Sequence, residues 1–130
     1  MGFEIEFIFL DKSLQPFNPL DRLNSYQTTA GLRDQTLDIV EEILDCLKES
    51  SINVQHFHSE TVNQIELALD PKSPLEAIDS LILAEETIRR VFVRHNIKTT
   101  MTPKPLLDGT TASICICPLT NWCLRIQTAS

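Results

Sequence analysis

The opening stretch of this 130-residue chain constrains its fold more than any other part. Residues 2–9 read Gly-Phe-Glu-Ile-Glu-Phe-Ile-Phe, and such a density of aromatic and β-branched residues predicts a β-strand. Because successive side chains of a strand point to opposite faces, every second residue lies on one apolar face that needs a hydrophobic core. The residues of that face are Phe3, Ile5, Phe7 and Phe9.

Two carboxylates lie on the opposite face of the same predicted strand. Glu4 and Glu6 share that face with Ile8 and Leu10. Residues two apart in a strand are separated by about 6.5–7 Å, so the two charges repel each other unless a cation lies between them. A divalent cation that prefers oxygen ligands would meet this need. An edge strand with a solvated acidic face is the alternative, and both interpretations stay open at this point.

The composition and net charge exclude some classes of function for this chain. The chain is 42% hydrophobic and 22% charged, which is ordinary for one globular domain. Its net charge of −7 argues against nucleic-acid binding, because phosphates require a basic surface, and it suits metal binding. No secretory signal or membrane-spanning apolar run is visible, so we expect a cytoplasmic protein without a membrane partner. Three of the four cysteines lie between residues 115 and 123, which does not predict a disulfide framework.

The rest of the chain alternates between helix and strand patterns. Amphipathic periodicity predicts helices over residues 32–50 and 74–95. Short alternating stretches predict strands at 52–57, 64–69 and 97–102. The order β-α-β-β-α-β predicts an α+β fold, in which an antiparallel β-sheet carries helices on one face.

The second predicted helix has a start signal and a positively charged end. Residues 73–76 read Ser-Pro-Leu-Glu, a capping box with proline at the first helical position. Arg89, Arg90 and Arg94 either complement the helix dipole or clamp a phosphate. We expect the buried face to consist of apolar residues at helical spacing. These are Leu75, Ile78, Leu81, Ile82, Ile88, Val91 and Phe92.

Two more glutamates extend the acidic face of the predicted sheet. Glu60 follows the strand at 52–57, and Glu66 lies on the next predicted strand. If these two segments form a hairpin beside the first strand, their carboxylates converge with those of Glu4 and Glu6. Hard cations take several oxygen ligands, and phosphoryl-transfer enzymes use such ions to hold phosphates. Four separately solvated glutamates are the alternative.

A soft-metal site is a competing interpretation. Cys115, Cys117 and Cys123 could combine with His56 and His58. Zinc sites usually show wider cysteine pairs, so small buried hydrophobic side chains on an apolar strand are the stronger interpretation for the cysteines.

Several short motifs, taken in order, resemble the catalytic domain of the glutamine synthetase family. The opening strand resembles the start of that domain, and residues 58–60 with 64–66 resemble its second metal-binding block. The resemblance covers residues 2 to about 113. Within the family, the sequence resembles the fungal glutamine-synthetase-like proteins, some of which act in development. It implies a partial glutamine synthetase catalytic domain over residues 1–130. The further matching blocks lie at 73–77, 89–91, 104–105 and 108–110.

The resemblance implies a metal-dependent ligase driven by ATP. The family joins glutamate and ammonia through a γ-glutamyl phosphate, while Mg²⁺ or Mn²⁺ neutralises charge on the moving phosphoryl group. The positions that match Glu6, Glu60 and Glu66 hold the metal nearest the substrate carboxylate. The position that matches Glu4 helps to hold the metal on the ATP phosphates.

The resemblance also implies substrate contacts and an assembly. The position that matches His58 lies beside the nucleotide and the phosphate path, and Gly109 matches the glutamate-binding turn. The family forms ring oligomers in which neighbouring subunits share each active site.

The chain departs from the family at its metal-binding positions. The loop between Glu60 and Glu66 is short and has Asn63 where the family commonly has glycine. Residues 114–117 read Ile-Cys-Ile-Cys where the family has a His-x-His block that completes the ATP-side metal site. Residues 114–130 therefore form an atypical tail, which a shifted reading frame or altered splicing would explain. The tail region still has strand-like patterns at 113–119 and 121–127.

These departures set the functional expectation. The family's later arginines and glutamate, and its small N-terminal domain, are not found in this sequence. We expect an incomplete, inactive catalytic domain with no intact catalytic set, weak binding of one Mg²⁺ or Mn²⁺ ion, and no ring. A non-catalytic regulatory or interaction protein on the same fold is one alternative, and an unrelated acidic α+β binding module is another.

Overall fold

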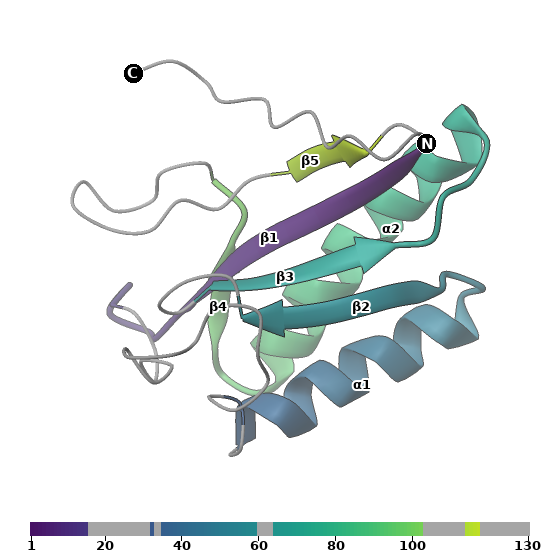
Figure 1. Ribbon diagram of the computed structural model, residues 1–130. Helices are drawn as coiled ribbons and strands as arrows, with labels where there is room; N and C mark the ends of the chain where they lie inside the picture. The colour runs from purple at the N-terminus through teal and green to yellow at the C-terminus, as the bar shows by residue number, and fades with distance from the viewer. Residues whose placement is uncertain (16–31, 33–34, 60–63, 103–113, 118–130) are drawn as a thin grey trace, which may run out of the picture.

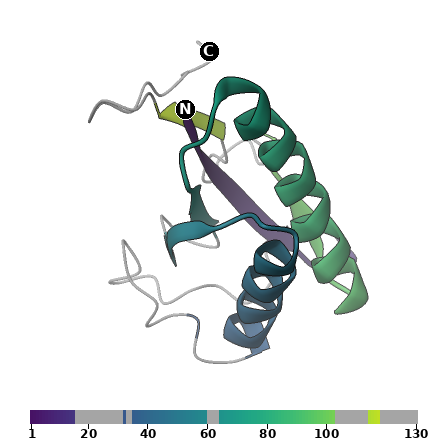
Figure 2. The ribbon, with the colours of Figure 1, turned by 90° about the vertical axis from the view of Figure 1, so that its right-hand side faces the viewer.

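The computed structural model describes residues 1–15, 32, 35–59 and 64–102, together with the backbone of 114–117. An antiparallel sheet carries two helices on one of its faces, which confirms the predicted α+β fold (Figure 1, Figure 2). In the part of the chain that is described, neither helix combines the length and the apolar character needed to cross a membrane. The elements are β1 (Gly2–Leu10), α1 (Gln35–Glu49), β2 (Val54–Ser59), β3 (Gln64–Leu69), α2 (Pro74–Arg94), β4 (Lys98–Thr100) and β5 (Ile114–Cys117).

Strand β1 is the centre of the sheet. The strand order is β2-β3-β1-β4, and β5 also pairs with β1. Strand β4 lies along the C-terminal part of β1, with Ile8 opposite Thr100, whereas β5 lies along the N-terminal part, with Gly2 opposite Cys117. All of these pairings are antiparallel, so β1 receives partners on both sides along most of its length.

The hydrophobic core lies between the sheet and the two helices. Ile5, Phe7 and Phe9 of β1 are fully buried in it, as the alternation in the sequence predicts. Phe92 of α2 packs on both phenylalanines, with ring centroids 5.7 Å from Phe7 and 5.6 Å from Phe9. The residues that α1 contributes to the core lie along one stripe of the helix. They are Ile39, Val40, Ile43 and Leu47.

The buried stripe of α2 differs from the predicted one in its N-terminal half. Leu75, Ile78 and Ile82 were expected in the core but are 72%, 44% and 59% exposed. Small residues take their place, because apolar side chains occur on more than one side of this helix and periodicity alone does not identify the inner side. The buried residues of α2 are Ala77, Ser80, Ala84, Ile88, Val91 and Phe92.

Strand β2 begins and ends two residues later than predicted. Ile52, expected in the strand, instead completes the turn after α1, because its N–H donates a 2.9 Å hydrogen bond to the Leu47 carbonyl. Ser51 has a φ of 59°, a left-handed conformation that directs the chain out of the helix. The shift places His58 and Ser59 inside the strand, where their side chains have fixed directions.

The capping-box residues of α2 contact each other in a different way from the predicted one. The helix begins at Pro74, as expected, but the Ser73 hydroxyl donates its hydrogen bond to the Glu76 carboxylate and does not cap a backbone N–H.

The start of the atypical tail joins the sheet. Strand β5 falls inside the predicted strand 113–119, and the other predicted strand, 121–127, lies outside the described residues.

Candidate metal site on the sheet

The face of the sheet opposite the core helices carries three of the predicted acidic residues, Glu4, Glu6 and Glu66. The strand registers align side chains on this face in rows that cross three strands. Glu6 of β1 lies opposite Glu66 of β3, and Glu66 lies opposite His58 of β2. This row therefore brings two carboxylates and one imidazole together. The neighbouring row consists of Glu4, Ala68 and His56.

Glu6 and Glu66 are buried although both are acidic, with exposed fractions of 4% and 6%. Residues directly opposite in an antiparallel pair have Cβ atoms about 4.5–5.5 Å apart, and like charges in this position destabilise a sheet. Burial increases the cost unless polar or positive groups lie close by. Gln64, which is also buried, donates a 2.7 Å hydrogen bond from Nε2 to Glu6 Oε2. The arrangement of buried oxygens therefore fits a divalent cation of the Mg²⁺ or Mn²⁺ type.

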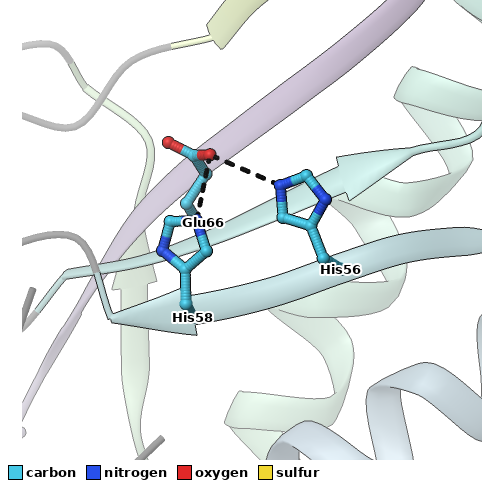
Figure 3. A group of neighbouring side chains, drawn as sticks. All are labelled: His56, His58 and Glu66. Carbon is cyan, nitrogen blue, oxygen red and sulfur yellow. Dashed lines mark ion pairs between the residues drawn. The ribbon is translucent and has the colours of Figure 1, made fainter. Parts of the chain in front are cut away.

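Two imidazoles of β2 point toward Glu66 (Figure 3). The distance from Glu66 Oε1 to His58 Nε2 is 3.6 Å, and the distance to His56 Nε2 is 4.0 Å. The two rings are stacked, with centroids 5.5 Å apart and an angle of 6° between their planes. His58 Nδ1 lies 3.3 Å from the Ser59 carbonyl oxygen. Donor atoms of His56, His58 and Glu66 all lie within 4.8 Å of one another.

The structure locates some of the predicted site residues. Glu4, Glu6 and Glu66 are on one face of the sheet, with Glu4 one row away from the buried pair. Glu60 and Gly109 lie outside the described residues, so the convergence of four carboxylates and the glutamate-binding turn stay predictions.

The structure separates the histidines from two of the cysteines of the competing soft-metal interpretation. Strands β3 and β1 lie between β2 and β5, which puts β5 about 14 Å from the histidines at the usual strand spacing. Cys115 and Cys117 are therefore too far away to share an ion with His56, and Cys123 is outside the described residues. The prediction considered His56 only together with the cysteines. The spacing of His56 and His58, which places both side chains on one face of a strand, is the signal that could have identified the pair.

Arg89 and Arg94, near the end of α2, form ion pairs. Arg89 contacts Glu85 and Glu86, each at 2.9 Å, and Arg94 contacts Glu42 at 2.7 Å. These pairings favour helix-surface charges over a phosphate clamp.

Comparison with known proteins identifies the class to which this fold and acidic patch belong. A family model described as the catalytic domain of glutamine synthetase matches residues 1–115. The chain therefore belongs to the glutamine synthetase family. Ligand-free GmaS superposes with a TM-score of 0.76 at 19% identity, covering 88% of this chain and 28% of that chain. Plasmodium falciparum glutamine synthetase gives a TM-score of 0.71 at 22% identity, with the same two coverages of 88% and 28%.

The curated relatives are longer proteins. Protein fluG of Emericella nidulans is 31% identical over 111 residues, which are 80% of this chain and 13% of fluG. Type-1 glutamine synthetase 1 of Dictyostelium discoideum is 31% identical over 86 residues, which are 65% of this chain and 17% of that protein. γ-Glutamylpolyamine synthetase GlnA3 of Streptomyces coelicolor is 30% identical over 73 residues, covering 55% of this chain and 16% of GlnA3. The chain thus spans less than a fifth of each of these relatives.

Proposed function

We propose that this chain forms the metal-binding part of a glutamine-synthetase-type active site. The observation that carries the proposal is the buried pair of Glu6 and Glu66, directly opposite each other on β1 and β3. The reaction class is ATP-dependent carbon–nitrogen ligation at a γ-glutamyl phosphate. The amine is the variable part, since the names of the relatives include both glutamine synthetase and γ-glutamylpolyamine synthetase.

Within this site we assign roles by combining the contacts with the family resemblance. Glu6 and Glu66, with Glu60, are ligands of one Mg²⁺ or Mn²⁺ ion. When bound, such an ion neutralises phosphoryl charge and polarises the phosphate. Gln64 holds the Glu6 carboxylate in position through its 2.7 Å hydrogen bond. His58 lies beside Glu66, at the position that the family resemblance puts next to the phosphate path.

The ATP-side metal position has a different chemistry in this chain. Glu4, its expected carboxylate, lies opposite Cys115 of β5, in the strand that replaces the family's His-x-His block. Thiols are soft ligands, whereas Mg²⁺ requires oxygen, so this segment does not provide the second ion with the expected ligand. Since transfer of a phosphoryl group in such sites uses more than one ion, we propose that the chain alone binds one ion and does not form glutamine.

Calorimetric titration of Mn²⁺ into the purified chain tests the proposed ion site. Glu6→Gln and Glu66→Gln should each abolish binding, because each removes one ligand charge, and Glu60→Ala tests the third expected ligand. Glu41→Gln is the matched control, because Glu41 is an exposed residue of α1. Unchanged Mn²⁺ affinity in Glu6→Gln would show that the site is wrongly assigned.

A coupled assay for ATP-dependent glutamine formation tests the proposed lack of activity. We expect no turnover above the level of a no-enzyme control. Turnover that Glu6→Gln abolishes would contradict the proposed inactivity while supporting the assignment of the metal site.

A further inference from the structure

The imidazole pair beside Glu66 has the chemistry of a different class of metal. We propose that His56, His58 and Glu66 form a binding site for a divalent first-row transition ion, with Zn²⁺ as its representative. Two imidazole nitrogens and one carboxylate oxygen, all within 4.8 Å of one another, suit zinc, nickel or cobalt. The ligands come from two paired strands of the sheet, so the backbone holds them in place.

Two of the three distances between donor atoms are close to those around a tetrahedral ion. Zinc bonds of about 2.0–2.2 Å place neighbouring ligand atoms about 3.3–3.5 Å apart. Glu66 Oε1 lies 3.6 Å from His58 Nε2 and 4.0 Å from His56 Nε2. Both separations are too long for hydrogen bonds. The three donor atoms lie within 4.8 Å of one another, and a side-chain rotation at the half-exposed His56 can bring its Nε2 closer to both of the other atoms.

The hydrogen bond of His58 directs the correct nitrogen toward the proposed ion. A carbonyl oxygen only accepts, so the contact between Ser59 and His58 Nδ1 places a proton on Nδ1. With the proton on Nδ1, the lone pair that a metal ion requires is on Nε2, the nitrogen that lies toward the Glu66 carboxylate. Metal-binding histidines commonly have this arrangement, with the second ring nitrogen donating to a carbonyl or carboxylate.

The burial of the three side chains leaves a path for the ion. The His56 side chain is 50% exposed, whereas those of His58 and Glu66 are 15% and 8% exposed. An ion can therefore enter from the His56 side, and water or another ligand can complete its coordination there. Glu66 belongs to both proposed sites, so a zinc-class ion would compete with Mg²⁺ or Mn²⁺. This competition rests on the function proposed above, but the histidine site itself does not.

The test combines Zn²⁺ titration of the full chain with NMR of the imidazole nitrogens. We expect the signals of His56 and His58 to shift on zinc binding, while His95 stays unchanged because its Nε2 contacts Glu42 at 2.7 Å elsewhere in the fold. Loss of an outer hydrogen-bond partner of a metal ligand weakens binding roughly 10–100-fold. His56→Gln removes a ligand itself, so it should weaken Zn²⁺ binding by at least as much. The same variant should leave Mn²⁺ affinity unchanged, and His95→Gln should leave both affinities unchanged. His56 is half-exposed, so its replacement leaves the core intact.

A Co²⁺ titration separates this site from binding by cysteines. Cobalt held by nitrogen and oxygen lacks the intense thiolate-to-metal charge-transfer band that cysteine ligands produce. Zinc affinity that is unchanged in His56→Gln, or a thiolate band at the first equivalent of cobalt, would overturn the proposal. Zinc binding that depends on His56 in a chain that binds no Mn²⁺ would support the histidine site and overturn only the proposed function.

Discussion

At the scale of single residues, the neighbours of a carboxylate decide what it binds. Glu66 has Glu6 on one side and His58 on the other, so the same side chain borders an oxygen-rich site and a nitrogen-rich one. The two-residue period of β1 and β3 made the face of Glu6 and Glu66 predictable. Their cross-strand partners depend on the register between strands, which the sequence of a single strand does not determine. The predicted end of β2 at residue 57 also left His58 outside the strand, so its place beside Glu66 could not be derived.

Gln64 provides a test of how the buried carboxylates are positioned. Its amide donates the 2.7 Å hydrogen bond to Glu6, and the residue is only 2% exposed to solvent. We expect Gln64→Ala to weaken Mn²⁺ binding about 10–100-fold, because an unsupported ligand carboxylate loses its orientation. Gln55→Ala, on the exposed part of β2, is the control and should bind like the unmodified chain. Equal calorimetric affinities for the two variants would contradict a positioning role for Gln64.

At the scale of secondary-structure elements, the limits of periodicity are visible in α2. The C-terminal half of the predicted stripe is buried as expected, with Ile88, Val91 and Phe92 in the core, while the neighbouring Val93 is 65% exposed. In the N-terminal half, Ile78 and Ile82 offer a second apolar stripe, and the core instead receives small residues. A helix that approaches a sheet through small side chains gives only a weak hydrophobic signal in its sequence.

Two isoleucines of α2 test which side of the helix is buried. Ile88→Ala should lower the free energy of unfolding by about 2–5 kcal/mol, because a fully buried side chain leaves a cavity. Ile82→Ala should change it by less than about 0.5 kcal/mol, because Ile82 is 59% exposed. Urea denaturation followed by circular dichroism measures both. Equal losses of unfolding free energy for the two variants would indicate that Ile82 is buried, as the periodicity of the sequence predicts.

The contact between α1 and α2 should depend on pH. Glu42 accepts from His95 at 2.7 Å and pairs with Arg94 at 2.7 Å. The hydrogen bond from His95, followed by the charge of Arg94, lowers the pKa of Glu42 below the value of 4.5 for a free glutamate. A carboxyl with a lowered pKa in the folded state stabilises the fold above its unfolded pKa, and this stabilisation is lost as the pH falls through the folded pKa.

We therefore expect Glu42→Gln to cost about 0.2–1 kcal/mol near pH 6, since the pair is partly exposed to solvent. The difference between the two proteins should shrink as the pH falls below 4.5, where the native carboxyl becomes protonated. Urea denaturation at a series of pH values measures the difference, with Glu41→Gln as control. A difference that grows toward acid pH would contradict the assigned direction.

At the scale of the whole molecule, β1 joins the core to the candidate site. One face of this strand packs on the phenylalanine of α2, and the other face carries Glu4 and Glu6. The fold class was predictable because long, strongly periodic elements define it. The chemistry of the acidic patch was predictable in outline from the family resemblance, whereas the proximity of His56 to Glu66 required the assembled sheet.

Metal binding should stabilise the entire fold, because the proposed ligands come from strands that also form the core. An ion that binds only the folded chain adds about 2.7 kcal/mol when its free concentration is about 100-fold above Kd. For a chain of this size, that corresponds to a rise in Tm of roughly 8–14 °C. Differential scanning calorimetry with and without Mn²⁺ measures the shift, and Glu6→Gln should abolish it while Glu41→Gln retains it. A full Mn²⁺-dependent rise in Glu6→Gln would mean that the stabilising ion binds away from the β1–β3 pair, and the proposed site would then be wrong.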